Sequence, residues 1–235
     1  ITFAMNQSDI LTTVSQSLKN DTLKHFKIKN EIHVVPNFVC AEEYQQDRDM
    51  KLRRKYVKDD EKVLLHISNF RPVKKVEDVV RVFALVKKSI KCKLVLVGDG
   101  PDAKLIDHLC MELGVCNDTV RVGKLKDVRT ILSIADLFLL TSETESFGLV
   151  ALEAMASGIP VISTNTGGIP EVNIHEKTGY LSDVGDVADM AKNAIVLLED
   201  EQTMSVFQAN ALNIAREFDI QNVLPLYESL YKRLI

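Results

Sequence analysis

Two glutamates, Glu145 and Glu153, are separated by seven residues that lead from a predicted loop into a predicted helix. The glycine between them, Gly148, would leave the first N–H groups of that helix bare, and a helix N-terminus of this kind binds phosphate. A carboxylate further along the same helix could accept hydrogen bonds from two neighbouring sugar hydroxyls. The spacing therefore predicts a phosphate site beside a ribose site. The alternative is that Glu145 caps the helix and Glu153 faces solvent.

Two further loops are expected at the carboxyl ends of strands, where ligands bind in open α/β sheets. The first, Thr166-Gly167-Gly168, has paired glycines that leave its backbone amides accessible. The second contains Arg71 and Lys74, two cations that could pair with a diphosphate. Each loop also has an ordinary interpretation. The first would then be a tight turn, and the second a solvated basic loop.

A third motif, Gly98-Asp99-Gly100-Pro101-Asp102-Ala103, follows a predicted strand, precedes a predicted helix and fits the dinucleotide pattern G-x-G-x-x-G/A. That pattern is completed by an acidic residue about 20 positions further on, at the end of the next strand. Here the next predicted strand ends at Gly123 instead. A nicotinamide or flavin oxidoreductase is therefore one alternative function, and a simple strand-to-helix turn is the other interpretation.

Apolar, β-branched runs alternate with amphipathic stretches along the chain, which is the pattern of a parallel sheet covered by helices. Strands are predicted at 10–14, 32–35, 63–67, 93–97, 120–122, 137–140, 160–162 and 179–181. Helices are predicted at 76–88, 103–113, 186–198, 202–217 and 220–234, and Pro101 is expected at the entry to the second of them. The strands from residue 63 onward are expected to form one doubly wound α/β domain. The first 35 residues are expected to form a strand–helix–strand unit.

The composition excludes several classes of function. With 29 Lys and Arg against 33 Asp and Glu, the formal net charge is −4, so no basic face for nucleic acid is expected. The longest apolar runs are strand-sized, which predicts no membrane-spanning segment. The cysteines Cys40, Cys92, Cys110 and Cys116 have no metal-binding spacing and indicate reduced thiols in a cytoplasmic protein. The basic run 51–55 is interpreted as the solvated face of a helix.

Together these motifs resemble the retaining glycosyltransferases of family four, which have the GT-B architecture. The resemblance is carried by residues 145–161, by the Thr166-Gly167-Gly168 loop and by the turn at Gly98. It implies that Glu153 binds the nucleotide ribose and that Glu145 contacts the donor sugar. It also implies that backbone amides and an Arg/Lys pair hold the diphosphate.

The resemblance implies a catalytic set of Glu145, Lys74 and Arg71. In the family four residues separate the arginine from the lysine, whereas only two residues separate Arg71 from Lys74. Besides Glu153, the expected substrate-binding residues are Ser146, Phe147, Gly148, Leu149, Thr166, Gly167, Gly168, Gly123 and Leu125. No metal ion and no cofactor is expected.

Family members have an N-terminal acceptor domain and a C-terminal nucleotide-sugar domain. By this resemblance, residues 1–37 are the last part of the acceptor domain with its linker, residues 38–218 are the nucleotide-sugar domain, and residues 219–235 are a helix that packs back toward the N-terminal domain. The chain is therefore expected to lack most of the acceptor domain. On its own it is expected to bind the donor without transferring the sugar.

The stretch 68–79 is similar to the branch of the family that moves N-acetylglucosamine from UDP-N-acetylglucosamine to L-malate in bacillithiol biosynthesis. This implies a bacterial, cytoplasmic enzyme whose partners are a nucleotide-sugar donor and a small-molecule acceptor, without nucleic acid or membrane. The alternatives are a family-four transferase with another donor and acceptor, and a sugar-nucleotide-binding fragment without transferase activity. A homodimer is a further possible partner arrangement.

Overall fold

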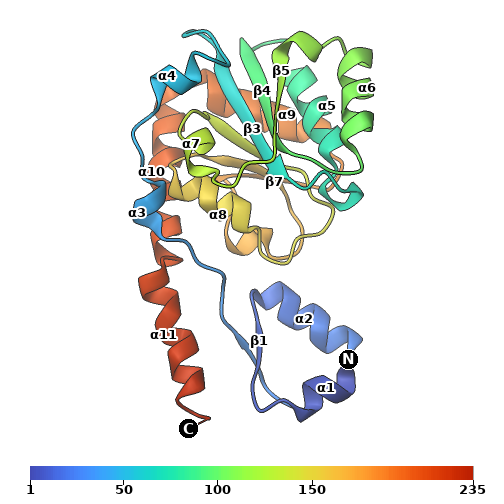
Figure 1. Cartoon of the computed structure of the whole chain (residues 1–235), viewed down its shortest axis with the longest axis vertical. Helices are drawn as coiled ribbons and strands as arrows, with labels where there is room; N and C mark the ends of the chain where they lie inside the picture. The colour runs from blue at the N-terminus through green and yellow to red at the C-terminus, as the bar shows by residue number, and fades with distance from the viewer. Residues whose placement is uncertain (235) are drawn as a thin grey trace.

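A parallel six-stranded sheet forms the centre of the protein, in a computed structural model that describes residues 1–234 (Figure 1). The strands are β3 (Lys62–Ser68), β4 (Cys92–Gly98), β5 (Thr119–Gly123), β6 (Leu137–Leu140), β7 (Val161–Thr164) and β8 (Gly179–Ser182). They lie in the order β5-β4-β3-β6-β7-β8, and every neighbouring pair is parallel. The predicted doubly wound sheet is therefore confirmed.

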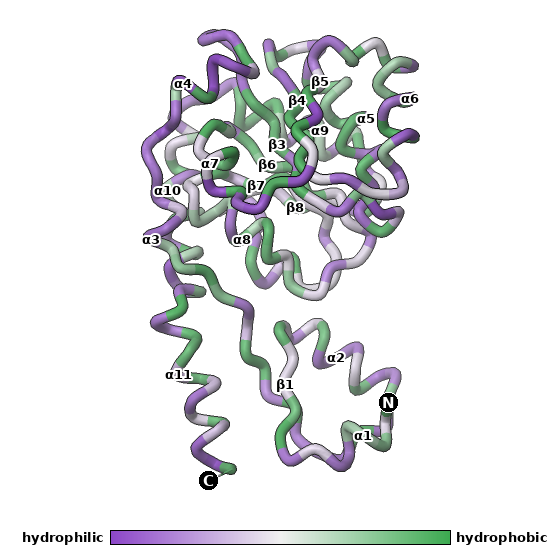
Figure 2. The backbone as a smooth tube through the Cα atoms, in the orientation of Figure 1, coloured by the Kyte–Doolittle hydropathy of each residue, from purple (hydrophilic) through white to green (hydrophobic). Residues whose placement is uncertain are grey.

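Helices cover both faces of this sheet. One face carries α5 (Val76–Val86), α6 (Ala103–Glu112) and α9 (Val187–Glu199), and the other carries α7 (Arg129–Leu132), α8 (Leu149–Ala156) and α10 (Glu201–Glu217). Successive residues of a strand point to opposite faces, so Leu64 enters the core with α5 and α9, whereas Val63 and Leu65 enter the core with α8 and α10. Figure 2 shows these strands as hydrophobic segments between more polar loops.

A smaller part lies below the sheet domain in Figure 1. Its strands β1 (Leu11–Thr13) and β2 (Ile32–Val34) pair in parallel on either side of α2 (Gln16–His25) in the chain, which confirms the predicted strand–helix–strand unit. The other elements are α1 (Thr2–Gln7), the linker helices α3 (Ala41–Tyr44) and α4 (Met50–Arg53), the 3-10 helices η1 (Pro72–Lys74), η2 (Cys116–Asp118) and η3 (Ile169–Glu171), and α11 (Ile220–Tyr231). Helix α11 extends from the sheet domain and contributes Val223 and Leu230 to a small core with Val35.

Every strand predicted from the sequence is present, with ends within two residues of those expected, and the five longer predicted helices are present as well. The short helices α1, α3 and α7 are not predicted, because one or two turns give no clear helical periodicity. Helix α4 overlaps the basic run 51–55, which is interpreted from the sequence as a helix face. Pro101 lies before α6, whose N-cap is Asp102, and not in its first turn. Over residues 1–234, none of the helices is long and apolar enough to cross a bilayer.

One arginine of the basic run 51–55 is buried, so the interpretation of this run as a solvated helix face is wrong at that residue. The Arg53 guanidinium donates to an Asp136 carboxylate oxygen at 2.9 Å. Asp136 also accepts hydrogen bonds from the backbone N–H of Val63 at 2.7 Å and from Arg48 at 2.7 Å. This carboxylate therefore joins α4 and the linker to the amino ends of β3 and β6.

Replacing Asp136→Asn is expected to lower the free energy of unfolding by about 2–4 kcal/mol, because the buried Arg53 guanidinium loses its carboxylate partner. Asp59→Asn is the matched control, since Asp59 pairs at 3.0 Å with Arg54 where both side chains are exposed. That control should leave the free energy of unfolding close to the wild-type value, because an exposed ion pair is screened by solvent. Urea denaturation of the three proteins measures both values, and equal effects of the two variants would contradict this account of Asp136.

Candidate functional site

The candidate site lies where the order of the strands reverses. From β3 the chain proceeds through β4 to β5 on one side, and from β6 through β7 to β8 on the other. The connections that follow β3 and β6 therefore leave the sheet in opposite directions and open a crevice at the carboxyl ends of these neighbouring strands. Lys74 lies in η1 after β3, and Glu145 lies in the loop after β6.

An ion pair joins the two sides of this crevice. Lys74 Nζ lies 2.5 Å from Glu145 Oε2, and the two side chains are 20% and 16% exposed. The hydroxyl of Ser142 donates to the same carboxylate oxygen at 3.3 Å. The hydroxyl of Thr141 donates to the Lys74 carbonyl oxygen at 2.9 Å, so the backbone of one loop is also tied to the other. An anion that enters the crevice would meet a lysine whose position is already fixed.

The N-terminus of α8 is open, as the sequence predicts. Its N-cap, Gly148, has φ of +92°, a left-handed conformation that favours glycine, and contributes no side-chain hydrogen bond. Within residues 1–234 the backbone N–H groups of Phe147, Gly148, Leu149 and Val150 donate to no acceptor. The Phe147 ring is buried and packs edge-on against Phe218. These unpaired amides at a helix N-terminus form an anion-binding geometry.

The glycine pair of the Thr166-Gly167-Gly168 loop allows this loop to pack directly on the backbone of the segment that contains Glu145. A Cβ atom on Gly167 would collide with the Glu145 carbonyl oxygen, and one on Gly168 would collide with that of Ser146. The Gly168 N–H donates to the Glu145 carbonyl oxygen at 2.9 Å, and the Thr166 hydroxyl donates to that of Glu143 at 3.0 Å. The loop after β7 therefore supports the loop after β6.

The turn at Gly98 and Gly100 has a similar supporting role. A Cβ atom on Gly98 would collide with the Ser68 carbonyl oxygen, and one on Gly100 would collide with that of Asn69. The N–H of Asp102 donates to the Phe70 carbonyl oxygen at 3.1 Å. The glycines thus allow the turn after β4 to pack against the backbone that leads to η1.

Glu153 is half-buried on α8. Its Oε1 accepts a hydrogen bond from the Tyr44 hydroxyl at 3.0 Å. Burial raises the pKa of the Glu153 carboxyl above its ordinary value, and the Tyr44 hydrogen bond opposes that rise. The alternative in which Glu145 caps the helix is wrong, because Gly148 is the cap and Glu145 is paired with Lys74. Glu153 is not a fully solvated helix residue either, because one of its carboxylate oxygens is bonded to Tyr44.

Four predicted residues contribute no side-chain hydrogen bond or ion pair to Lys74, Glu145 or Glu153 in the described part of the chain. The Arg71 side chain is exposed and forms no hydrogen bond or ion pair within the described part of the chain. Gly123 ends β5 with φ of +79°, and Leu125 follows it as a 39% exposed side chain. The Ser146 side chain is exposed as well. The structure therefore joins the side chains of Lys74 and Glu145 but bonds the Arg71 side chain to neither.

Sequence reasoning misses three residues at this edge. Tyr44 bonds Glu153, as described above, and lies in a one-turn helix of the linker. The Ser15 hydroxyl donates to the Ser146 carbonyl oxygen at 2.7 Å and caps α2 by accepting from the N–H of Leu18. The Glu171 carboxylate accepts from the first two backbone N–H groups of α2, each at 2.8 Å. Ser15 precedes a polar helical stretch, which is a recognisable N-cap signal, whereas Glu171 and Tyr44 give none.

Glu171→Gln is expected to loosen α2, because a neutral amide accepts from the two N–H groups more weakly than a carboxylate does and loses the favourable interaction with the helix dipole. Backbone amides at 16–20 should exchange with deuterium about three- to tenfold faster, whereas those of β3 should not change. Glu176→Gln, at an exposed turn, is the control. Unchanged exchange in α2 of the first variant would show that this contact does not hold the helix.

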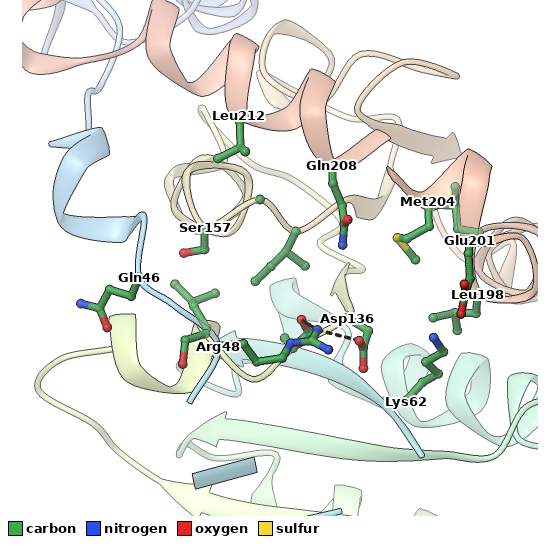
Figure 3. Close-up of a pocket in the computed structure, with 16 residues that line it drawn as sticks. Gln46, Arg48, Lys62, Asp136, Ser157, Leu198, Glu201, Met204, Gln208 and Leu212 are labelled. Atoms are coloured by element: carbon green, nitrogen blue, oxygen red, sulfur yellow. Dashed lines mark hydrogen bonds and ion pairs between the residues drawn. The ribbon is translucent and has the colours of Figure 1, made fainter. Parts of the chain in front are cut away.

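A cavity of about 500 Å³ lies at the opposite edge of the sheet, at the amino ends of β3, β6 and β7 (Figure 3). Arg48 and Asp136 point toward each other there and are already paired with one another. Lys62, Glu201 and Gln208 also line it. None of the predicted site residues lines this cavity. In residues 1–234 there is also no cluster of three or more side chains suited to hold a metal ion.

The doubly wound sheet with an open helix N-terminus at its switch point defines an open α/β domain, the class in which ligands bind beyond the carboxyl ends of the strands. Residues 48–213 match the family model described as glycosyl transferases group 1, and the chain belongs to this family. The alternative of a nicotinamide or flavin oxidoreductase is therefore wrong.

A similar sequence is the N-acetyl-alpha-D-glucosaminyl L-malate synthase of Bacillus anthracis, which is 44% identical over 98% of this chain and 61% of its own length. Two solved structures share the fold. Anabaena HepE in complex with UDP and glucose has a TM-score of 0.89 at 24% identity over 98% of this chain and 65% of its own. Sucrose-phosphate synthase from Thermosynechococcus elongatus has a TM-score of 0.89 at 23% identity over 99% of this chain and 60% of its own.

The chain thus spans less than two thirds of the length of these three proteins. The predicted GT-B type of α/β fold is confirmed by the sheet order and by these structural neighbours. The chain is a group 1 glycosyltransferase sequence, as the resemblance implies.

Proposed function

We propose that this chain binds the donor of a retaining glycosyltransferase that moves N-acetylglucosamine from UDP-N-acetylglucosamine to L-malate. The observation that carries the proposal is one helix, α8, with four unpaired N–H groups at its N-terminus and the half-buried carboxylate of Glu153 further along it. A diphosphate and a ribose are groups that these two features would recognise. The 44% identity to an N-acetyl-alpha-D-glucosaminyl L-malate synthase supports the choice of sugar and acceptor.

In this proposal the amides of Phe147, Gly148 and Leu149 and the charge of Lys74 hold the diphosphate, and Glu145 faces the donor sugar. During transfer the bond from the sugar C1 to the phosphate oxygen breaks, and a bond from C1 to the malate hydroxyl oxygen forms on the same face. The hydroxyl proton passes to a phosphate oxygen of the leaving UDP. Fixed amides and Lys74 would stabilise the negative charge that develops on that leaving group.

The proposal includes a bacterial, cytoplasmic setting in bacillithiol biosynthesis. Four cysteines that are unpaired in the described part of the chain support a reducing compartment. It also includes the three-part organisation 1–37, 38–218 and 219–235. The position of β1 and β2 apart from the six-stranded sheet supports the first boundary, and the course of α11 beyond that sheet supports the last (Figure 1).

One test of this proposal concerns Glu153. Glu153→Gln should weaken UDP binding about 10- to 100-fold, because the ribose loses a charged acceptor. Since burial raises the pKa of this carboxyl in the folded protein, its ionisation at neutral pH costs stability. The melting temperature of the variant should therefore be kept or raised at pH 7. Calorimetry with UDP and a thermal melt measure both quantities.

The pH profile of the same titration provides its control. Wild-type affinity should fall as the pH drops through the raised pKa of Glu153, whereas the variant should lack that limb. Protonation of UDP itself affects both proteins equally, so the difference between the two profiles reports Glu153. Equal affinity and equal profiles would remove Glu153 from the nucleotide site.

Another test of this proposal concerns Lys74. Lys74→Ala should weaken UDP binding at least tenfold more than uridine binding, because uridine has no phosphate to lose a charged partner. Lys75→Ala is the matched control, since Lys75 is engaged by Asp78 at 3.2 Å on the neighbouring helix. Isothermal titration of UDP and of uridine into the three proteins tests this. An equal loss for UDP and uridine would place Lys74 outside the diphosphate site.

A further inference from the structure

The contact between Tyr44 and Glu153 joins two parts of the protein that lie 109 positions apart in the sequence. Tyr44 ends α3 in the linker between the small part and the sheet domain, and its ring packs on the core beneath α8. It lies outside the residues 48–213 that match the family model. The family match therefore does not account for it.

We propose that Tyr44 is a positioning residue for the donor nucleoside, which holds Glu153 so that its second carboxylate oxygen faces the ribose hydroxyls. This inference rests on the proposed function, because it gives Glu153 a ribose to bind. It adds a residue from the linker to a site otherwise built from the loops of the sheet.

The two oxygens of the Glu153 carboxylate have different surroundings. Oε1 accepts the Tyr44 hydroxyl at 3.0 Å. Across residues 1–234, Oε2 accepts no hydrogen bond, and it is not among the buried atoms that lack a partner, so it is open to solvent. An ionised carboxylate has about four acceptor positions, and one hydrogen bond from the phenol leaves the others free. The phenol thus fixes the orientation of the carboxylate without occupying its open oxygen.

Tyr44 is suited to donate this hydrogen bond at neutral pH. Burial, followed by the nearby charge of Glu153, raises the pKa of the Tyr44 phenol well above its ordinary value. The phenol therefore keeps its proton there and remains a donor to the Glu153 carboxylate.

Contacts on both sides hold α3 in place. The N–H of Ala41 donates to an Asp219 carboxylate oxygen at 2.9 Å, at the start of α11. Glu43 forms an ion pair with Arg129, which in turn donates to Asp127 at 2.7 Å. The segment that leads from β5 to Arg129 contains Leu125, so α3 connects the Glu153 carboxylate to that loop. A tyrosine on a segment anchored in this way can restrict the rotamer of its acceptor.

The consequence is discrimination between nucleotides with and without a ribose hydroxyl. A fixed acceptor that pairs with a hydroxyl is left unpaired when the hydroxyl is absent, which penalises the deoxy nucleotide. An acceptor that is free to rotate can turn to water instead and penalises it less. Removal of the Tyr44 hydroxyl should therefore reduce selectivity for UDP over 2′-deoxy-UDP as well as affinity.

The test compares Tyr44→Phe with Tyr56→Phe. Tyr56 is a half-buried tyrosine packed on the same core, and its hydroxyl makes no hydrogen bond in the described chain. Calorimetry measures the affinity of each protein for UDP and for 2′-deoxy-UDP. For Tyr44→Phe we expect UDP affinity to fall about three- to tenfold and the preference for UDP over 2′-deoxy-UDP to fall by a similar factor. Tyr56→Phe should match the wild type in both.

A purely structural role for Tyr44 would lower both affinities by one factor and keep their ratio, and that result would overturn the proposal. So would an unchanged affinity for both nucleotides. Thermal melts of the two variants should agree with the wild type, because phenylalanine keeps the packed ring. If the wild type binds UDP with a preference that Tyr44→Phe retains, only the Tyr44 proposal fails. If the wild type binds no UDP, the proposed function fails with it.

Discussion

The parallel order of the six strands, with its reversal between β3 and β6, is the constraint on which the candidate site depends. Parallel strands end at one edge of the sheet, so the loops that follow them meet there although they are far apart in the sequence. Lys74 and Glu145 are 71 positions apart and still approach to 2.5 Å. The two cores that hold the strands in register therefore also hold the charges of the site.

Hydrogen bonds and closely packed glycines then fix the position of the loops that meet at this edge. Glu145 is supported from one side by Lys74 and from the other by the Gly168 amide, which bonds its carbonyl oxygen. Neither Gly167 nor Gly168 has room for a Cβ atom against this backbone. The N–H groups at the start of α8 are left without partners, although most backbone donors in a folded chain are paired. The hydrogen bonds at this edge of the sheet thus stabilise the loops, and the N–H groups at the start of α8 remain available to a ligand.

The strands and the longer helices could be predicted from the sequence because their apolar periodicity is strong and local. Glu145, Glu153 and Lys74 could be predicted because they follow strands or enter helices at recognisable spacing. Tyr44 and Glu171 could not, because their partners are set by how the linker and α2 pack on the sheet domain, which no local pattern contains. The burial of Arg53 could not be predicted for the same reason, since it depends on Asp136, 83 positions away.

The nucleotide diphosphate is proposed to bind at the N-terminus of α8, and an NMR titration of backbone amides with UDP tests this placement most directly. We expect the largest chemical-shift changes at 147–150, with smaller ones at 166–168. We expect no change around Arg48 and Lys62, which line the cavity at the opposite edge of the sheet. Shifts confined to that cavity, with 147–150 unaffected, would contradict the account.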